Sequence, residues 1–598
     1  MAGDLVAKRC WLLTEEVRPI TVQDCGIKVT VTFALRWMEF KGLPSGRHEA
    51  RETMKRKSIS FLLLWICPFL VATQLFLRPA LSSEATRKTP EASHKANGDA
   101  PPETSSQVTP RTSTKEDSEK PPVVSHPTKP PVITRHAISL RGQVLNYRAT
   151  AGTMTINDDS GKPKAHMFFV AYTKEEGKDL SRRPVTFAFN GGPGASSVWL
   201  HMGALGPKRA LLTEEGKGLP PPYRLVPNDY TWLHFTDLVF IDPVGTGYSR
   251  PAAGVKAEEF FGVKEDIASV GEFIRLYVTR NNRWLSPKFI AGESYGTTRT
   301  AGLLGYLQNH VGMNLNGVML ISSVLNFQTI SFSPGNDLPF ILYLPAYTCA
   351  AWYHKKLPPF LQEDLEKTRE EVEHFALNEY LLALAKGNEL PEMERDRIIE
   401  KLSFYTGLPK TYVNNANLRI SQTEFIRELL RPENRRLGIL DSRITGGYKV
   451  ENFIEDPSVY EVYGSFIATW SDYVRRELKY ESDLTYTGLS GKANRAWNWR
   501  SGTEGMGYLD VATILQTAMN ENKFLKVFIA SGFYDLDTSY FATKYTINSL
   551  DLVPGSKGNV ALRFYDAGHQ MYTSLPALKK LQSDVASFVK GAVPSPKD

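Results

Sequence analysis

The five residues Gly-Glu-Ser-Tyr-Gly at positions 292–296 constrain the fold of this chain more than any other feature. They follow a short apolar segment at 289–291 and precede a helical pattern at 298–307. Glycines around a serine permit a tight, strained turn between a strand and a helix, and such a turn lifts the serine hydroxyl out of the sheet. An ordinary serine in a turn is the alternative, because the motif alone is common. The strand and the helix around Ser294 favour the strained turn.

Short, fully apolar segments recur on both sides of this motif, as in the buried strands of a parallel sheet. Before the motif, residues 258–279 place their apolar side chains on one face of a helix. A succession of strand, turn, helix and strand is typical of a doubly wound sheet. We therefore predict an α/β protein with the α/β-hydrolase fold, a doubly wound and mostly parallel sheet. The apolar segments are 185–189, 238–241, 289–291, 317–323, 527–530 and 561–565.

The sheet is expected to be interrupted by a long helical insertion. Between 326 and 510 the segments are charged and helical, and no short apolar strand recurs. We interpret this stretch as a cap, inserted between a first core part at 134–325 and a second core part at 511–592, with a tail at 593–598. Alternation predicts antiparallel strands at the start of the core, and an amphipathic helix is expected to close it. These elements are 143–150, 152–156, 166–172 and 577–590.

A serine hydroxyl needs a base, and in this fold the acid and then a histidine follow the serine along the chain. His569 comes just after the last apolar strand, in the loop position of a base. The acid should follow the preceding strand, where we choose Asp535 and keep Asp537 as the alternative. Ser294, Asp535 and His569 are therefore the expected catalytic triad. Three other histidines after Ser294 lie at a helix end or inside the expected cap: His310, His354 and His374.

A second glycine-rich loop, Asn-Gly-Gly-Pro-Gly-Ala-Ser-Ser at 190–197, follows another apolar strand. Its glycines would let backbone N–H groups approach a ligand closely. A phosphate-binding loop and a merely flexible turn are the alternatives. The loop lacks the Lys-Ser/Thr ending of a P-loop and the spacing of a dinucleotide-binding loop. Beside a serine nucleophile, we expect this loop to form the oxyanion hole.

Five motifs occur in the order and approximate spacing of the serine carboxypeptidase family: 190–197, 242–249, 292–296, 532–535 and 568–571. The chain resembles this family over about residues 135–591. The resemblance implies a serine exopeptidase that removes residues from the C-termini of peptides or proteins through an acyl-enzyme. It also implies that the backbone N–H groups of Gly192 and Tyr295 form the oxyanion hole, and that Asn190 and Glu293 bind the substrate's C-terminal carboxylate.

The chain departs from the family pattern at several positions. Family members often carry Trp and Cys where this sequence has Ala188 and Ala195, and their usual disulfides have no cysteines here. The chain therefore looks like the cysteine-poor, bacterial-type branch. Family members also tend to place a Glu, which pairs with the Glu beside the nucleophile, where this chain has Ala204. Unless desolvation alone holds it neutral, Glu293 should then ionise near the ordinary value of about 4.3. If Glu293 does not bind the carboxylate, Asn190 or a cation such as Arg299 would do so.

The first 133 residues are expected to be processing and linker segments. Residues 54–83 have a basic start, an apolar stretch and small residues near their end, as in a secretory signal peptide. We expect translation to begin at Met54, with 1–53 an over-extended N-terminus. Residues 84–133 are dominated by Pro, Ser, Thr, Lys and Glu, which predicts a disordered linker. The expected location is periplasmic or extracellular, and an uncleaved signal would tether the chain to the membrane.

Composition excludes several other classes of protein. The net charge of +7 is spread over many residues, and no long basic block with aromatics follows the first hundred, so we expect no nucleic-acid partner. The four cysteines form no C-x-x-C pair, and we expect no metal, cofactor or disulfide framework. An esterase or acyltransferase with the same triad remains the first alternative, because family resemblance determines the machinery better than the leaving group. An exported binding protein with a decayed site is the second.

Overall fold

A computed structural model describes residues 130–175, 179–449, 456–503 and 507–594. The expected N-terminal extension at 1–53 and the expected signal at 54–83 lie outside the described residues, as does nearly all of the expected linker at 84–133. Within the described part of the chain, no helix combines the length and the apolar character that crossing a membrane requires.

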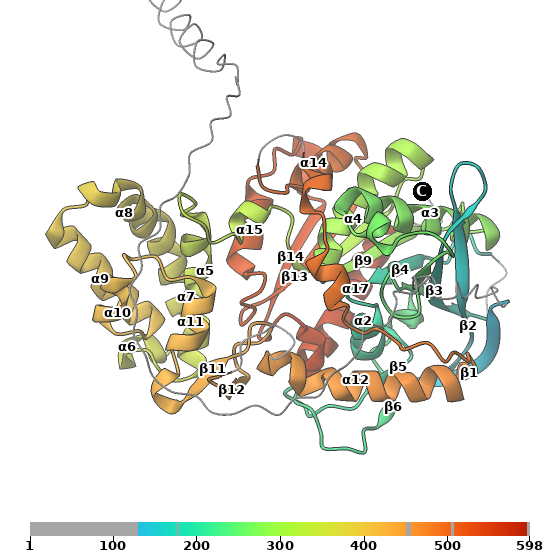
Figure 1. Cartoon of the computed structure of the whole chain (residues 1–598), viewed down its shortest axis with the longest axis horizontal. Helices are drawn as coiled ribbons and strands as arrows, with labels where there is room; N and C mark the ends of the chain where they lie inside the picture. The colour runs from blue at the N-terminus through green and yellow to red at the C-terminus, as the bar shows by residue number, and fades with distance from the viewer. Residues whose placement is uncertain (1–129, 176–178, 450–455, 504–506, 595–598) are drawn as a thin grey trace, which may run out of the picture. The chain divides into compact units, whose positions relative to one another are not determined.

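The described residues form a ten-stranded mixed sheet with the strand order β1-β2-β3-β7-β4-β9-β10-β13-β14, and β8 pairs with β3 (Figure 1). The strands β7, β4, β9, β10, β13 and β14 run parallel to one another, whereas β1, β2, β3 and β8 pair antiparallel. The predicted doubly wound, mostly parallel α/β sheet is therefore confirmed. The strands are β1 (Val132–Leu140), β2 (Gln143–Asn157), β3 (Pro163–Lys174), β4 (Val185–Phe189), β7 (Asp237–Ile241), β8 (Arg250–Pro251), β9 (Lys288–Ser294), β10 (Gly317–Ser323), β13 (Lys526–Gly532) and β14 (Val560–Tyr565).

The antiparallel start of the sheet differs from the sequence prediction in two respects. The strand β1 was not predicted; it forms by pairing with β2, and its residues 132–133 fall in the segment expected to be linker. Two short strands were expected at 143–150 and 152–156, but β2 is a single strand that runs through Gly152. A Cβ at Gly152 would lie 2.8 Å from Pro131, so glycine allows the preceding chain to pack on the strand.

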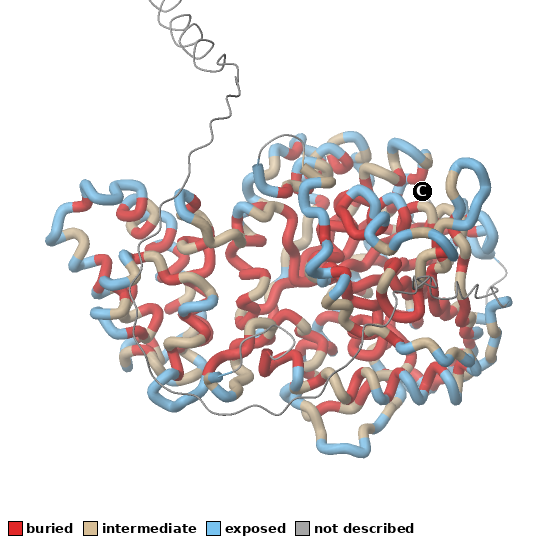
Figure 2. The backbone as a smooth tube through the Cα atoms, in the orientation of Figure 1, coloured by how far each residue is buried: buried red, intermediate tan, exposed pale blue. Residues whose placement is uncertain are grey.

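Helices cover both faces of the sheet, and the buried residues are concentrated along the strands and the helices that pack on them (Figure 2). Successive residues of a strand point to opposite faces, so Phe289 belongs to one hydrophobic cluster and Ile290 to the other. The cluster that contains Ile290 joins the sheet to α3, α4 and α14, and the cluster that contains Phe289 joins it to α2, α12 and α17. These helices are α2 (Val198–Leu200), α3 (Val263–Arg280), α4 (Tyr295–Tyr306), α12 (Pro457–Arg476), α14 (Ala512–Glu521) and α17 (Leu575–Ala592).

The chain between β10 and β13 is mostly helical, and its helices belong to different parts of the structure. The helices from α5 to α11 form a third hydrophobic cluster together with α15 and with Tyr534 and Leu536, which follow β13. By contrast, α12 packs on the sheet with α2. The expected cap at 326–510 therefore contains one helix that completes a layer of the sheet. The remaining helices are α5 (Leu338–Tyr353), α6 (Pro359–Gln362), α7 (Leu365–Phe375), α8 (Leu381–Lys386), α9 (Glu392–Thr406), α10 (Lys410–Asn415), α11 (Gln422–Glu428), α13 (Gly491–Arg495), α15 (Tyr540–Asn548) and α16 (Pro554–Lys557).

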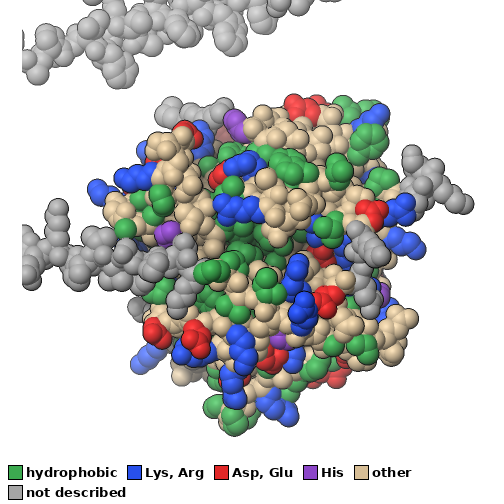
Figure 3. Space-filling view, turned by 90° about the vertical axis from the view of Figure 1, so that its right-hand side faces the viewer, with side chains coloured by type: hydrophobic (Ala, Val, Ile, Leu, Met, Phe, Trp, Pro, Cys, Tyr) green, Lys and Arg blue, Asp and Glu red, His purple; other side chains and the backbone are tan. Residues whose placement is uncertain are grey.

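Two small hairpins lie outside the main sheet. The strands β5 (Lys208–Ala210) and β6 (Leu225–Pro227) pair antiparallel, and so do β11 (Arg435–Leu437) and β12 (Thr445–Gly447). On the face seen in Figure 3, basic and acidic side chains are interspersed, and hydrophobic side chains gather near the centre of the view.

A buried ion network holds the start of β7. The carboxylate of Asp237 accepts hydrogen bonds from Arg283 Nη1 at 2.6 Å and from Arg183 Nε at 3.1 Å. The side chains of Arg283 and Asp237 are 3% and 2% exposed. Removing one member of a buried pair leaves its partner charged and desolvated, which costs far more than losing a surface pair.

We expect Asp237→Ala to lower the free energy of unfolding by about 3–5 kcal/mol, measured by urea denaturation. Glu272→Ala is the matched control, because Glu272 pairs with Arg275 on α3 where both side chains are partly exposed. The control should lose less than about 1 kcal/mol. Equal losses in the two variants would contradict this account of the Asp237 network.

Candidate active site

Ser294 lies at the junction of β9 and α4. It is the last residue of the strand and the N-cap of the helix, with φ 60° and ψ −132°. A non-glycine residue in this region of backbone space is strained, and such residues cluster at functional sites. The strained strand-to-helix turn that the Gly-x-Ser-x-Gly motif predicts is therefore present.

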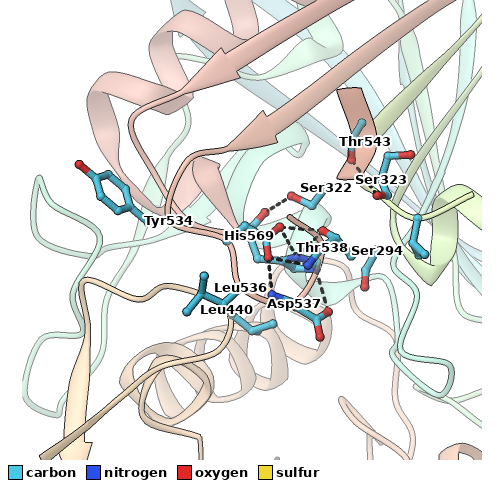
Figure 4. Close-up of polar contacts among 12 residues, drawn as sticks. Ser294, Ser322, Ser323, Leu440, Tyr534, Leu536, Asp537, Thr538, Thr543 and His569 are labelled. Atoms are coloured by element: carbon cyan, nitrogen blue, oxygen red, sulfur yellow. Dashed lines mark hydrogen bonds and ion pairs between the residues drawn. The ribbon is translucent and has the colours of Figure 1, made fainter. Parts of the chain in front are cut away.

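Asp535 and His569 meet beside this turn, from the loops after β13 and β14. The Nδ1 atom of His569 lies 2.8 Å from Oδ2 of Asp535, and both side chains are buried. Asp535 also accepts hydrogen bonds from the N–H groups of Asp537 and Thr538 and from the Thr538 hydroxyl. These donors offset the cost of burying its negative charge. Figure 4 shows Ser294 beside the His569 imidazole.

Asp537, the alternative acid, lies near the other nitrogen of the imidazole. Its Oδ2 is 4.0 Å from His569 Nε2, and its side chain is 33% exposed. The structure thus places Asp535 on Nδ1, where the orienting acid of a triad belongs, and Asp537 on the side of Nε2.

The charge on His569 is stabilised by the acids around it. Burial by itself lowers the pKa of His569, but Asp535 first, then Asp537 and Glu293, outweigh this effect and raise it to about 9. A general base must carry a proton during the reaction, and carboxylates that stabilise the imidazolium help it to do so.

The loop after β4 packs directly against the turn at Ser294. A Cβ at Gly191 would lie 2.4 Å from the amide nitrogen of Gly296 and 2.5 Å from that of Tyr295, so only glycine allows this approach. The N–H of Gly192 donates to no acceptor within the described residues. Tyr295 is the first residue of α4, and an N–H at this position has no acceptor in its own helix. Both predicted oxyanion-hole donors are therefore free to bind a ligand.

These groups line one cavity of about 620 Å³. Ser294 and His569 face it together with Asn190, Gly192 and Glu293. The four parallel strands β4, β9, β13 and β14 all end at this edge of the sheet, because the carboxyl ends of parallel strands lie on the same side. The fold thus brings six of the seven predicted site residues to one cavity or into direct contact with it: Asn190, Gly192, Glu293, Ser294, Asp535 and His569. The seventh, Tyr295, adjoins Ser294 at the turn.

Glu293 also lines this cavity, and its surroundings determine how readily it ionises. The side chain is buried, and its Oε2 has no hydrogen-bond partner within the described part of the chain. Burial raises the pKa of Glu293 to about 7, and the nearby charge of His569 offsets only part of this rise. The ordinary value near 4.3 was expected unless desolvation held the group neutral, and this exception applies, because burial raises the pKa as a second carboxyl group would.

The comparisons with known proteins agree with this geometry. A family model described as "Serine carboxypeptidase" matches residues 140–573. The chain belongs to the serine carboxypeptidase family. Serine carboxypeptidase-like 34 of Arabidopsis thaliana is 28% identical over 204 residues, which cover 31% of this chain and 36% of that relative. The retinoid-inducible serine carboxypeptidase of Rattus norvegicus is 28% identical over 188 residues, covering 30% of this chain and 38% of the relative.

These matches span little more than a third of each relative. Among solved structures, the Kex1 prohormone-processing carboxypeptidase of Saccharomyces cerevisiae is similar, with a TM-score of 0.48 and 16% identity. That match covers 74% of this chain and 91% of the yeast chain. The comparisons establish the family, while the assignment of individual residues rests on the geometry above.

The sequence analysis did not identify the residues that position the active-site groups without lining the cavity themselves. The Thr538 hydroxyl donates to Asp535, and its spacing three residues after the acid is the only sequence signal for this role. Arg299 was considered as a cation for the substrate carboxylate, but it is fully buried and does not line the cavity. Its Nε donates to Asp266 at 2.7 Å and its Nη1 to the carbonyl of Asn190 at 2.7 Å. No local pattern marks Asp266, because the pair joins two helices.

We expect Arg299→Met to lower kcat by about 10²-fold, because the Asn190 carbonyl loses the donor that positions the loop. It should also lower the melting temperature, since Asp266 is left as an unpaired buried charge. In the double variant Arg299→Met with Asp266→Leu, the melting temperature should partly recover while kcat stays low. If kcat recovered together with stability, Arg299 would serve stability alone.

Proposed function

We propose that this protein is a serine-type carboxypeptidase that hydrolyses the C-terminal peptide bond through an acyl-enzyme. The observation that carries the proposal is the arrangement in one cavity of Ser294 and an Asp535-oriented His569, with a buried Glu293 beside the serine whose Oε2 has no hydrogen-bond partner among the described residues. The first three groups supply acyl transfer. The fourth supplies recognition of a free carboxyl terminus.

In this mechanism the Ser294 hydroxyl attacks the carbonyl carbon of the last peptide bond, and His569 Nε2 takes its proton. Asp535 holds the imidazole in the correct tautomer through Nδ1. The N–H groups of Gly192 and Tyr295 stabilise the negative oxygen that develops on the carbonyl. His569 then protonates the leaving amine, and water repeats the sequence on the acyl-enzyme with His569 again as base.

Glu293 and Asn190 are proposed to bind the terminal carboxylate of the substrate. A protonated Glu293 can donate a hydrogen bond to a carboxylate, whereas an ionised one repels it. The raised pKa of Glu293 keeps a large fraction of this group protonated up to near neutral pH. Asn190 Oδ1 accepts from the Leu200 N–H, which leaves the amide group as a donor toward the cavity.

We also infer that the chain is exported and processed, with a signal at 54–83 and a linker at 84–133, and that it acts outside the cytoplasm. Its four cysteines and the positions of Ala188 and Ala195 support the cysteine-poor, bacterial-type branch. N-terminal sequencing of the exported protein tests the processing. Sequencing of the unprocessed product tests the start at Met54.

The catalytic proposal predicts losses that do not add. Ser294→Ala and His569→Ala should each lower kcat by roughly 10⁴-fold or more, and the double variant should lose little beyond that. Asp535→Asn should cost about as much, because the imidazole takes the wrong tautomer. Asp537→Asn should be much milder. We would measure kcat of each variant on N-blocked peptides and test whether a fluorophosphonate labels Ser294.

Two outcomes would contradict these roles. Additive losses for Ser294 and His569 would argue against a shared mechanism, and a severe Asp537→Asn with a mild Asp535→Asn would reverse the assignment of the acid. Cleavage of small esters without release of C-terminal residues from peptides would favour the esterase or acyltransferase alternative.

The recognition proposal predicts a pH dependence that separates two kinds of substrate. Free-acid peptides need a protonated Glu293, whereas amide-capped peptides and esters do not. Because Glu293 loses its proton as the pH rises through about 7, the ratio of kcat/KM for free-acid over capped substrates should fall between about pH 6 and 8. The ionisation of His569 affects both substrates and cancels in this ratio.

Glu293→Gln is neutral at every pH and should flatten the dependence. A ratio that stayed constant in the unmodified protein would show that Glu293 does not bind the carboxylate. A fall centred near pH 4 instead of 7 would show that burial does not hold the group neutral.

A further inference from the structure

Among the described residues that line the catalytic cavity, Asp537 is the one acid that neither the triad nor carboxylate recognition uses. Besides His569, the charged side chains among the described lining residues are Glu293, Asp537 and Arg495. Glu293 sits buried beside the nucleophile, whereas Asp537 and Arg495 are open to solvent to different degrees. The cavity therefore presents one accessible carboxylate close to the reacting groups.

The position of Asp537 relative to His569 places it next to the scissile bond. Nδ1 of His569 is engaged by Asp535, so Nε2 must carry the proton between Ser294 and the leaving amine. Asp537 Oδ2 lies 4.0 Å from this nitrogen. Any substrate within reach of Nε2 therefore has a residue that flanks the scissile bond close to this carboxylate.

The backbone of Asp537 is held firmly while its side chain has no donor of its own. Its N–H donates to Asp535 Oδ1 at 2.8 Å, and its carbonyl accepts from the Tyr343 hydroxyl at 2.8 Å. Its carboxylate accepts no hydrogen bond from any described residue, and His569 is its one ion contact there. A positioned carboxylate with unused acceptor sites is ready to bind a cationic donor from a ligand.

Asp537 also carries its charge at neutral pH. Burial raises the pKa of Asp537 to about 6, although the charge of His569 opposes this rise, so the group is ionised at pH 7.5. The charges that act on its pKa are those of His569, Asp535 and Asp456. No Lys or Arg is among the described groups that set its charge.

We propose that Asp537 makes the enzyme selective for peptides with a Lys or Arg side chain on one of the two residues that flank the scissile bond. This inference rests on the proposed carboxypeptidase function. An ammonium or guanidinium group would satisfy the free acceptor sites of the carboxylate. A Glu or Asp side chain at the same place would be repelled by it.

The test uses two series of N-blocked tripeptides with free C-termini. In one series the last residue is Lys, norleucine or Glu, and in the other the residue before it varies in the same way. Norleucine keeps the length of the Lys stem without its charge. At pH 7.5 and low ionic strength, kcat/KM for Lys over norleucine should be about two- to fivefold in one of the series, as expected for a partly exposed charge pair. The ratio should shrink as salt is added.

Asp537→Asn should bring this ratio close to one, and Asp537→Glu should retain part of it. Asp472→Asn is the matched control, since it removes the same charge from α12 at an exposed site outside the cavity and should leave the ratio as it is. Arg495→Gln removes the cation of the same cavity and should not lower the ratio.

Two results overturn the inference and can be told apart from a failure of the proposed function. If norleucine is released but the ratio is near one in both series, or if Asp537→Asn leaves it unchanged, Asp537 does not select charge and the carboxypeptidase function still stands. If neither peptide is cleaved although Ser294 is labelled, the proposed function is wrong, and this inference falls with it.

Discussion

Asp535 and His569 are buried side by side, and the catalytic arrangement depends on the hydrogen bond between them. Burying two titratable groups costs free energy unless each is paired and hydrogen-bonded. Here the carboxylate accepts three further hydrogen bonds, from the N–H groups of Asp537 and Thr538 and from the Thr538 hydroxyl. These hydrogen bonds, all within one tight turn after β13, offset the free-energy cost of burying the pair. The same turn orients Nε2 toward the cavity.

A second constraint is the close packing of the two glycine-rich loops behind Ser294. No side chain fits between Gly191 and the amide groups of Tyr295 and Gly296. The backbone donors of the two loops can therefore converge on one point, where a carbonyl oxygen of a substrate would sit. Arg299 of α4 donates to the carbonyl of Asn190 in the first loop and to Asp266 on α3, so it fixes that loop against the helix that begins after Ser294. Strain at Ser294 is tolerated because the packing around it leaves no alternative.

Two carboxyl groups beside the triad, those of Glu293 and Asp537, differ in protonation because their surroundings differ. Glu293 is fully buried without a partner for Oε2, and it stays protonated to near neutral pH. Asp537 lies at the solvent-exposed side of the imidazole and is charged there. One group can donate a hydrogen bond to an anion, and the other can accept one from a cation. A peptide with a free carboxylate and a basic side chain would satisfy both.

Much of the fold and part of the site could be predicted from the sequence, because they depend on local patterns. Apolar segments of three to seven residues mark buried parallel strands, and Gly292 and Gly296 mark the turn at Ser294. The order of serine, acid and histidine follows from the order of the strands, and it indicates His569 as the base and Asp535 as the acid, with Asp537 as the alternative. The continuous strand through Gly152 and the packing of α12 on the sheet were not foreseen, because both depend on contacts with distant residues.

Other properties were decided only by the tertiary structure. The sequence left Asp535 and Asp537 as alternatives, and the two differ by which nitrogen of His569 each approaches. For Glu293 it showed the missing partner at Ala204 but left open whether desolvation raises the pKa, because burial cannot be read from the chain. Arg299 was a candidate for binding the substrate carboxylate, but in the structure it is buried and bonds Asn190 and Asp266 instead, which the sequence alone does not show. Motifs and strand order are properties of neighbouring residues, whereas desolvation and pairing depend on which distant residues surround a group once the chain is folded.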